Sequence, residues 1–441
     1  MKLQKPELLI PAGDFEKLKY AFAFGTDAVY AGIPLFSLRT REIGFTQNNI
    51  QEAIEYTHKL GKKIYLVMNI YAHNMKVNPF LNELERVVAM KPDALIMTDP
   101  GLINIALQKF PNMDIHLSTQ ANTTNWASVK FWRDLGIKRI ILTRELSLKE
   151  IAEMHKQVPD IELEAFVHGA ICIAYSGRCL ISNYLNHRDA NQGTCTNSCR
   201  WEYKLGYEKG SLLEVEKEQK PYSMEEYSPP PTGFYVKEQK RVNDKFPILE
   251  DEYGTYMMNS KDLCSIELLS DLAKAGVVSF KAEGRTKSVY YSAMVSRAYR
   301  RAIDDFYTGK KFDPENLRDL MALSSRTYTT GFYTRNPRQF GENFEDGYSQ
   351  SRTHKVAGII RNYNPKKHLA EIEIKNRIDV GNEIEIITPE YKKLITVKEI
   401  INKKDIRVES AHGGAENVFI PLENDPGEFA FLRKSLATNE N

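Results

Sequence analysis

The sequence predicts an α/β protein made of a (β/α)8 barrel, with a cysteine-rich insertion between strands 7 and 8, and a small C-terminal β-barrel domain. Short apolar runs rich in β-branched residues alternate with amphipathic stretches from the N-terminus, and eight such strand–helix units indicate the barrel. A late series of short strands separated by turn residues indicates the second domain. A doubly wound open sheet is the alternative for the first part.

The eight expected barrel strands are residues 8–11, 28–30, 64–69, 94–99, 114–119, 139–144, 162–169 and 277–284. Helical patterns such as FEKLKYAFAFG and NNIQEAIEYTHKLG lie between them, and their final glycines are typical of helix C-caps. A long helical pattern, SVYYSAMVSRAYRRAIDDFY, follows the last strand. We therefore assign residues 1–311 to a TIM-like barrel.

Residues 170–262 separate the last two barrel strands and hold most of the cysteines. The segment PPPTG within this insertion is incompatible with a regular helix or a central strand, so it predicts a loop. In a parallel barrel, the chain leaves each strand at the C-terminal face, where active sites form. We therefore expect the cysteines to lie over the mouth of the barrel.

After the barrel, the alternation of strand and helix patterns ends and a series of short strand patterns follows. Residues 312–353 are interpreted as a linker with some helix, and residues 435–441 as a frayed tail. Residues 354–434 contain the strand patterns KVAGIIRNY, LAEIEIKN, GNEIEIITP, LITVKEII, IRVES and NVFIPL. Their even spacing predicts a small β-barrel.

The composition is that of an ordinary globular protein: 441 residues, 42% hydrophobic and 27% charged, with a formal net charge of +2. This charge balance neither demands nor excludes a nucleic-acid partner. The start, MKLQKPELLIPAG, lacks the apolar run of a signal peptide, and no segment approaches 18 consecutive apolar residues. We expect a cytoplasmic protein, in which clustered thiols indicate a metal site or catalysis rather than disulfides.

Four of the five cysteines, Cys172, Cys179, Cys195 and Cys199, fall within one short window. Four thiolates hold either an iron–sulfur cluster or a tetrahedral zinc ion. The spacing contains no CxxC pair, which makes zinc the weaker alternative, and ordinary buried cysteines are the third interpretation. Cys264 lies in NSKDLCSIELLSDLAKAG, which predicts a helix capped by Asn259 or Ser260; there a core cysteine is favoured, with a reserve ligand as the alternative.

Polar side chains recur at the ends of the predicted strands. They are Asn69, Asp99, Ser118, Thr119, Gln120, Arg144, His168, Lys281, Glu283 and Arg285. Arginine forks bind carboxylates, so Arg144 and Arg285 are candidate ligands for a carboxylate. Each residue also has a structural alternative: Arg285 pairing with Glu283, and His168 satisfied by its neighbours.

Several long motifs are similar to the signature of the U32 peptidase family. They are ELLIPAGDFEKLKYAFAFGTDAVYAG, ELEAFVHGAICIAYSGRCLISNYLNHRDANQGTCTNSCRW, NSKDLC and FKAEGRTKS. The length and the appended β-domain resemble members of the family that hydroxylate tRNA. The resemblance implies oxygen-independent formation of 5-hydroxyuridine at the wobble position, with prephenate as a required metabolite.

The resemblance also implies a cofactor, an iron–sulfur cluster (4Fe–4S) held by Cys172, Cys179, Cys195 and Cys199, and it leaves other activities open. Related members hydroxylate ribosomal RNA or a ubiquinone precursor, and older members are named peptidases or collagenases. The sequence has no HExxH helix and no GxSxG elbow, although a Cys–His pair using His168 or His187 remains possible in space. A thiolate bound to a cluster is not free to attack a carbonyl. We therefore favour the hydroxylase, with Arg144, His168, Glu283 and Arg285 as its candidate catalytic residues.

A tRNA partner, contacted at its anticodon loop, requires a basic surface. Candidate contacts are Lys281, Arg285, Lys287, Arg297, Arg300, Arg301, Lys310, Lys311, Arg352, Lys355, Arg361, Lys366 and Lys367, with Tyr363 as a stacking aromatic. Within the cysteine segment, His187 and Arg188 are candidates for contacts with cluster sulfur or with RNA phosphate. Solvated surface charge is the alternative for all of them.

Overall fold

The computed structural model describes residues 4–38, 44–172, 174–186, 188–192, 195–196, 199, 235–236, 246–247, 249–251, 254–256, 261–323, 328–334 and 354–436. The expected PPPTG loop, His187, Arg352 and the proposed caps Asn259 and Ser260 lie outside these residues.

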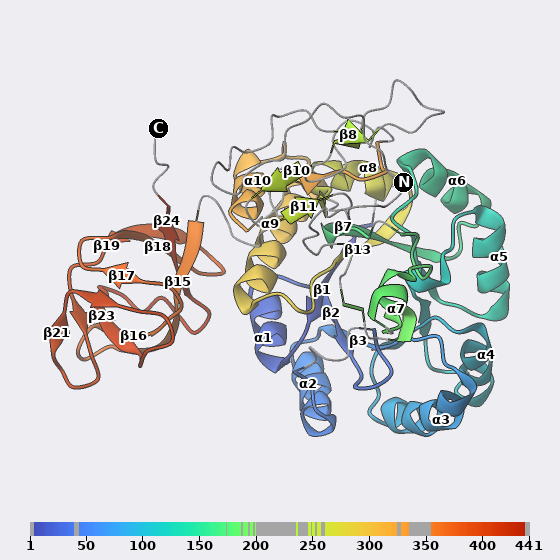
Figure 1. Ribbon diagram of the computed structural model, residues 1–441, viewed down its shortest axis with the longest axis horizontal. Coiled ribbons are helices and arrows are strands. Elements are labelled where there is room, and N and C mark those ends of the chain that lie inside the picture. The colour runs from blue at the N-terminus through green and yellow to red at the C-terminus, as the bar shows by residue number, and fades with distance from the viewer. Residues whose placement is uncertain are drawn as a thin grey trace, which may run out of the picture.

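Eight parallel strands form a closed barrel with helices on its outside, which confirms the predicted fold (Figure 1). The strands follow the order β13-β1-β2-β3-β4-β5-β6-β7, and β13 pairs with β7 to close the ring. Their bounds are β1 Glu7–Ala12, β2 Ala28–Gly32, β3 Lys63–Met68, β4 Ala94–Met97, β5 Ile115–Leu117, β6 Arg139–Ile141, β7 Glu162–Ala170 and β13 Val277–Ala282. The closed ring excludes the doubly wound alternative.

Most of the outer helices follow the barrel strands in the chain. They are α1 Phe15–Ala23, α2 Gln47–Lys59, α3 Asn74–Ala89, α4 Pro100–Lys109, α5 Trp126–Leu135, α6 Leu148–Gln157, α7 Ile181–Asn186, α8 Leu269–Lys274 and α9 Val289–Tyr307. Ser147 and Glu150 form a capping box at the start of α6. Gly136 ends α5 with φ of 107°, a left-handed conformation that glycine adopts without a Cβ clash.

A buried ion network crosses the barrel interior. Arg139 Nη1 lies 2.6 Å from Glu7 Oε1 and 3.1 Å from Glu164 Oε2, while Lys281 Nζ donates to Glu164 Oε1 at 2.8 Å. Glu164 has no exposed surface, and Lys281 is 3% exposed. Every charge in this network therefore has a partner of opposite sign, as buried ions require.

Strand β7 extends beyond the barrel and receives the returning chain. β12 (Asp262–Cys264) pairs antiparallel with it, placing Asp262 opposite Ala170 and Cys264 opposite His168. The predicted helix at Cys264 is therefore wrong: Cys264 lies on a strand, and α8 begins only at Leu269. β14 (Tyr328–Thr329) adds to β12, and α10 (Pro314–Met321) packs on α9, so these two elements belong structurally to the barrel.

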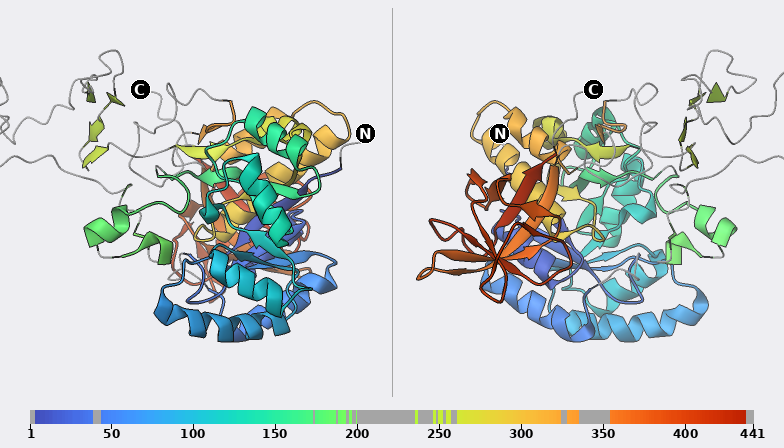
Figure 2. Two further views of the ribbon diagram at one scale, coloured as in Figure 1. Left: turned by 90° about the vertical axis from the view of Figure 1, so that its right-hand side faces the viewer. Right: turned by 60° about the vertical axis from the view of Figure 1, so that its left-hand side comes forward.

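The C-terminal domain is an antiparallel half-barrel, seen beside the barrel in Figures 1 and 2. Its sheet has the order β19-β18-β24-β15-β16-β23-β20-β21. The bounds are β15 His354–Asn364, β16 Leu369–Ile374, β18 Glu383–Ile387, β19 Lys392–Thr396, β20 Ile400–Ile401, β21 Arg407–Val408, β23 Val418–Pro421 and β24 Phe431–Ser435, with β17 Ile378–Asp379 and β22 Ser410–Ala411 as a separate pair. Strand β24 is absent from the sequence prediction, although it occupies the middle of the sheet.

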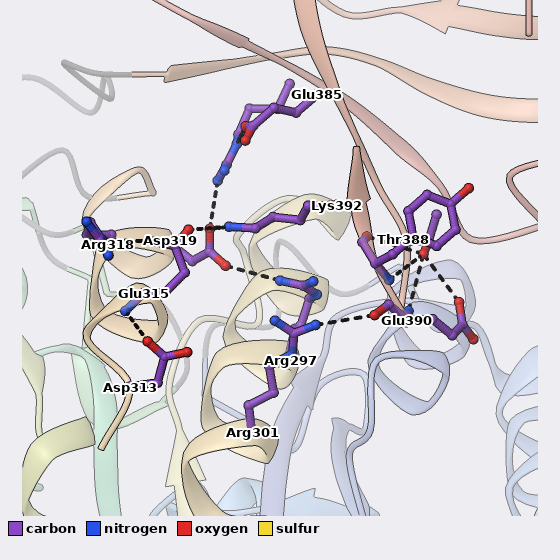
Figure 3. Close-up of polar contacts among 12 residues, drawn as sticks. Arg297, Arg301, Asp313, Glu315, Arg318, Asp319, Glu385, Thr388, Glu390 and Lys392 are labelled. Carbon is purple, nitrogen blue, oxygen red and sulfur yellow. Dashed lines mark hydrogen bonds and ion pairs between the residues drawn. The ribbon is translucent and has the colours of Figure 1, made fainter. Parts of the chain in front are cut away.

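The two domains share a buried interface. Apolar side chains from both form one cluster, including Tyr20 and Met294 of the barrel and Phe431 of the half-barrel. Asp319 accepts from Arg297, Lys392 and Arg433, and Figure 3 shows the first two of these ion pairs. Since Asp319 and its arginine partners are 3% exposed, the small domain is held to the barrel by both packing and charge.

Among the helices of the described residues, none combines the length and the apolar character that a membrane span requires.

Candidate functional site

A cavity of about 100 Å³ opens at the C-terminal ends of the barrel strands. We call it the mouth cavity. It is lined by Tyr30, Leu38, Val67, Asn69, Ile96, Ser118, Thr119, Gln120, Ile141, Arg144, Phe166, Ala170, Cys172, Lys281, Glu283 and Arg285. The lining thus combines an apolar wall with polar groups from several strands, at the end of the barrel where such proteins hold their ligands.

The structure brings most of the predicted strand-end residues together in this cavity. Asn69, Ser118, Thr119, Gln120, Arg144, Lys281, Glu283 and Arg285 all line it. Asp99 does not, because its carboxylate caps α4 by accepting from the backbone N–H groups of Gly101 and Leu102. His168 is also absent from the lining.

Arg144 presents a guanidinium that has no charged partner among the described residues. Its Cζ lies 3.8 Å from the centroid of the Phe166 ring, which fixes the group by a cation–π contact. Within the described part of the chain, the Arg144 side chain makes no hydrogen bond or ion pair. Its planar fork is therefore available to an anion in the cavity.

Arg285 is anchored to the loop after β2. Its Nη2 donates to the carbonyl oxygen of Leu38 at 2.5 Å, and its Nη1 lies 3.5 Å from Ser37 Oγ. The Arg285 Cζ also lies 5.9 Å from the centroid of the Tyr30 ring. These contacts fix the direction of the guanidinium at the edge of the cavity.

Lys281 forms the polar floor of the cavity. Its ammonium donates to Glu164 and lies 4.3 Å from the centroid of the Tyr30 ring. Burial lowers the pKa of Lys281, and Glu164 opposes that effect. The expectation that Lys281 belongs to an RNA-facing surface is wrong, because the side chain lies inside the barrel.

His168 faces away from the cavity because β7 contains a bulge. Phe166 pairs with Lys281 and His168 with Ala282, so Val167 is an extra residue between them. His168 is 1% exposed, and its Nδ1 lies 3.3 Å from Tyr299 Oη, whose hydroxyl donates to the carbonyl oxygen of Val167. Burial lowers the pKa of His168 to about 3, so the imidazole is neutral near pH 7.

The predicted cysteine ligands lie at and beside the mouth cavity. Cys172 is exposed and lines it, while Cys179, Cys195 and Cys199 are partly buried. Burial raises the pKa of the Cys179 thiol, and the thiols of Cys195 and Cys172 raise it further. All four are free thiols, a donor set whose chemistry fits an iron–sulfur cluster or zinc. In the described residues as they stand, no three His, Cys, Asp or Glu side chains are close enough to hold a metal ion.

Cys264 is separate from the loop thiols. It is 7% exposed, and its Sγ lies 3.7 Å from Tyr299 Oη. Burial raises the pKa of Cys264 to about 11, so this thiol is protonated at neutral pH. The structure places it in the core, in agreement with the favoured interpretation of the sequence.

The turn AYSGR attaches the cysteine segment to the barrel. The backbone N–H of Ser176 donates to Glu145 Oε1 at 3.2 Å, and Thr119 Oγ1 lies 3.4 Å from Ser176 Oγ. Gly177 has φ of 74°, and a Cβ at that position would meet the carbonyl oxygen of Gln120 at 2.1 Å. Glycine is therefore required for this close approach, a contact that the sequence reasoning missed.

Several of the candidate RNA contacts are committed to other partners. Arg297 is buried against Asp319, Arg300 pairs with Asp27 and Asp304, and Arg361 pairs with Glu16 and Glu373. Lys366 and Lys367 are exposed at the turn between β15 and β16. The Tyr363 hydroxyl, which lies near that turn, contacts His368 and Leu422.

The fold and the mouth cavity define a (β/α)8-barrel protein whose site lies at the C-terminal ends of the strands, with an appended half-barrel. A sequence model of peptidase family U32 matches residues 13–343, and a model of the family's C-terminal domain matches residues 352–433. The chain belongs to the U32 peptidase family.

Relatives match this chain over nearly its whole length. It is 45% identical to the tRNA hydroxylation protein P of Haemophilus influenzae, covering 98% of this chain and 96% of the relative. It is 47% identical to the tRNA hydroxylation protein P of Escherichia coli, covering 96% of this chain and 94% of the relative. It is also 31% identical to the 23S rRNA 5-hydroxycytidine C2501 synthase of Escherichia coli, over 68% of this chain and 39% of that protein.

Proposed function

We propose that this protein is an RNA hydroxylase that forms 5-hydroxyuridine at the wobble position of tRNA without molecular oxygen, with prephenate as a required metabolite. The observation that carries the proposal is one shared cavity: Cys172, Arg144 and Arg285 all line it. A redox centre and an anionic metabolite would then meet at the place where barrel proteins hold substrates. The full-length similarity to proteins named for tRNA hydroxylation supports tRNA as the substrate class.

In this proposal, the metabolite binds through its carboxylates. Prephenate is a small dicarboxylate, and two arginine forks match two carboxylates. Arg144 has no competing partner in the described residues, and Arg285 is held in place by Leu38. The apolar wall that includes Val67, Ile96 and Phe166 suits the carbon ring of such a ligand.

We propose Cys172, Cys179, Cys195 and Cys199 as the ligands of an iron–sulfur cluster (4Fe–4S), with zinc as the alternative metal. A cluster of this kind supplies one-electron redox chemistry when bound. The chain's own contribution is positional, because the bonds of Ser176 to Glu145 and Thr119 fix the segment that carries Cys172 and Cys179 against the barrel. A tRNA anticodon loop is the proposed partner, with the U32-type barrel as the catalytic domain.

The test of the proposed reaction is nucleoside mass spectrometry on tRNA from a strain that lacks this protein and is grown without oxygen. We expect 5-hydroxyuridine and its derivatives to disappear and to return with the wild-type chain. Unchanged 5-hydroxyuridine, in a strain with no second copy of the protein, would exclude tRNA as the acceptor. Hydroxycytidine in ribosomal RNA and hydroxylation of a ubiquinone precursor are then measured in the same cells.

The cysteine variants test the proposed cluster. Cys172→Ser and Cys179→Ser should each remove the iron and sulfide measured in anaerobically purified protein and should abolish the modification, since each removes a ligand. Cys264→Ser is the matched control and should keep the iron, because Cys264 is a buried core residue. Loss of iron in Cys264→Ser alone would contradict the ligand assignment, and a zinc-containing protein that cleaves peptides would favour the peptidase named by the family.

A further inference from the structure

Exposed apolar side chains collect at the mouth of the barrel. Among the large hydrophobic residues of the described chain, Leu35 is 72% exposed, Met75 90%, Trp126 43%, Tyr175 60% and Leu180 66%. All five follow the C-terminal ends of barrel strands or begin the helices after them. At the opposite end of the barrel, Leu60 is 46% exposed and Tyr307 40% exposed. Apolar groups gathered on one face mark an interaction surface.

Tyr175 is the aromatic residue of this surface that lies next to the mouth cavity. It stands three residues after Cys172, which lines the cavity, and next to Ser176, which is bound to Glu145 and Thr119. The backbone N–H of Arg178 donates to the carbonyl oxygen of Tyr175 at 3.0 Å and closes a tight turn. A turn fixed this firmly presents the Tyr175 ring to solvent instead of folding it into the core.

Leu35 provides a second, independent observation. Its φ of 70° is a left-handed conformation that a leucine adopts only at a cost of backbone strain. The N–H groups of Phe36 and Ser37 donate to the carbonyl oxygen of Ile33 and hold this turn, yet the strained side chain remains exposed. Leu35 follows β2, and the Tyr175 turn is bound beside the end of β6, so the two side chains stand at opposite sides of the closed ring.

Positively charged side chains beside Tyr175 and the mouth cavity indicate which class of partner binds this surface. Arg178 is exposed beside Tyr175, and its side chain makes no hydrogen bond or ion pair within the part of the chain that the structure describes. Arg144 lies on the Phe166 ring at the cavity and also has no ion-pair partner in the described residues. Aromatic rings next to cationic side chains are the arrangement that binds single-stranded nucleic acid, through base stacking and phosphate contacts.

We propose that Tyr175 stacks on an RNA base beside the nucleotide that enters the mouth cavity, and that Leu35 supports the opened strand from the other side. This inference rests on the proposed function and adds the residues that hold the substrate. Enzymes that act on a base must take it out of its stack, and they stabilise the open strand with aromatic and apolar side chains.

The test is fluorescence anisotropy with a synthetic RNA hairpin that carries an anticodon loop with uridine at the wobble position. Tyr175→Ala should bind the hairpin about tenfold more weakly than the wild-type holoprotein, and Tyr175→Phe within about twofold, because the ring makes the contact. Phe131→Ala is the matched control: Phe131 is 59% exposed on α5, outside the proposed surface, and its loss should leave the affinity unchanged.

Leu35→Gly keeps the proposal falsifiable if Tyr175→Ala is poorly folded. Glycine relieves the left-handed strain, so this variant should melt at a higher temperature while binding RNA several-fold more weakly. Wild-type RNA affinity in both Tyr175→Ala and Leu35→Gly would overturn this inference but not the proposed function. The exposed apolar surface would then be assigned to a protein partner. Failure of the wild-type protein to bind the hairpin, together with unchanged tRNA in the deletion strain, would overturn the proposed function as well.

Discussion

The interior of the barrel and its mouth both contain charged residues, but the two regions differ in whether those residues form ion pairs. Below the cavity, Glu164 binds Lys281 and Arg139, and Arg139 also binds Glu7. At the mouth, Arg144 rests on the Phe166 ring without an anionic partner in the described residues. Buried charges must be paired where they lie, whereas a charge at a ligand site stays available for the ligand.

The presence or absence of an ion-pair partner distinguishes structural from functional charged residues. Residue type and position in the sequence distinguish them less well. Lys281 and Arg285 stand four residues apart at the end of the same strand. Lys281 closes an internal ion pair, and Arg285 donates to a backbone carbonyl and keeps its positive charge at the cavity. We expect substitutions on the two sides to affect different measurements.

The largest effect is expected from Glu164→Gln. The substitution leaves Lys281, which is only 3% exposed, without its carboxylate partner, so the free energy of unfolding should fall by about 3–5 kcal/mol. Urea unfolding measures this loss. Glu85→Gln is the control, since Glu85 and its partner Lys109 are both about half exposed, and it should cost less than about 1 kcal/mol. Equal losses in the two variants would show that the interior network is not a structural element.

The next effect is expected from Arg144→Ala, which should reduce activity and preserve the fold. Loss of a charged hydrogen-bond donor to a carboxylate corresponds to about a ten- to hundredfold lower rate of tRNA modification. The free energy of unfolding should change by about 1 kcal/mol or less, because only the contact with Phe166 is lost. Arg144→Lys keeps the charge without the fork and should be intermediate; full activity in Arg144→Ala would remove this residue from the site.

The smallest effect near neutral pH is a pH dependence of the free energy of unfolding, and it arises from a buried residue, His168. His168 has a pKa near 3 in the folded state because it is buried, and an ordinary value near 6.5 when unfolded. Between these values the unfolded chain binds a proton that the folded chain excludes. His168 therefore destabilises the folded state as the pH falls from about 6.5 towards 3, by about 1.4 kcal/mol per pH unit.

His168→Phe keeps a ring in the same packing and removes this titration. Its free energy of unfolding should fall less steeply with decreasing pH than that of the wild type, as measured by urea unfolding at a series of pH values. Identical slopes in the two proteins would show that the His168 imidazole is accessible to protons in the folded state.

Periodicity and composition were sufficient to predict the barrel strands, because each is a short apolar run between turn residues. They missed β24, whose sequence FLRKS looks polar: Arg433 is buried there only because Asp319 and Glu385 of other elements neutralise it. They also misplaced the helix at Cys264, where pairing with β7 overrides the local helical pattern. Both errors involve partners that are distant in the sequence.

The sequence predicted only those parts of the candidate site that do not depend on contacts between distant residues. Residues at strand ends converge in any parallel barrel, so Arg144, Glu283 and Arg285 meet at the cavity as expected. Strand alternation places Phe166 and His168 on one face, and only the bulge at Val167 reveals that they lie on different faces. The exposure of Tyr175 and Leu35 likewise follows from the way their turns are anchored, which composition does not encode.

The pairing of β12 with the overhanging end of β7 has a consequence for how this protein can vary. Ala170, where the cysteine segment leaves the barrel, lies directly opposite Asp262, where the chain returns. With both ends fixed side by side, doubling the length of the intervening segment adds only about 0.6 kcal/mol of closure entropy. The barrel can therefore accept insertions and deletions between these two residues at little thermodynamic cost.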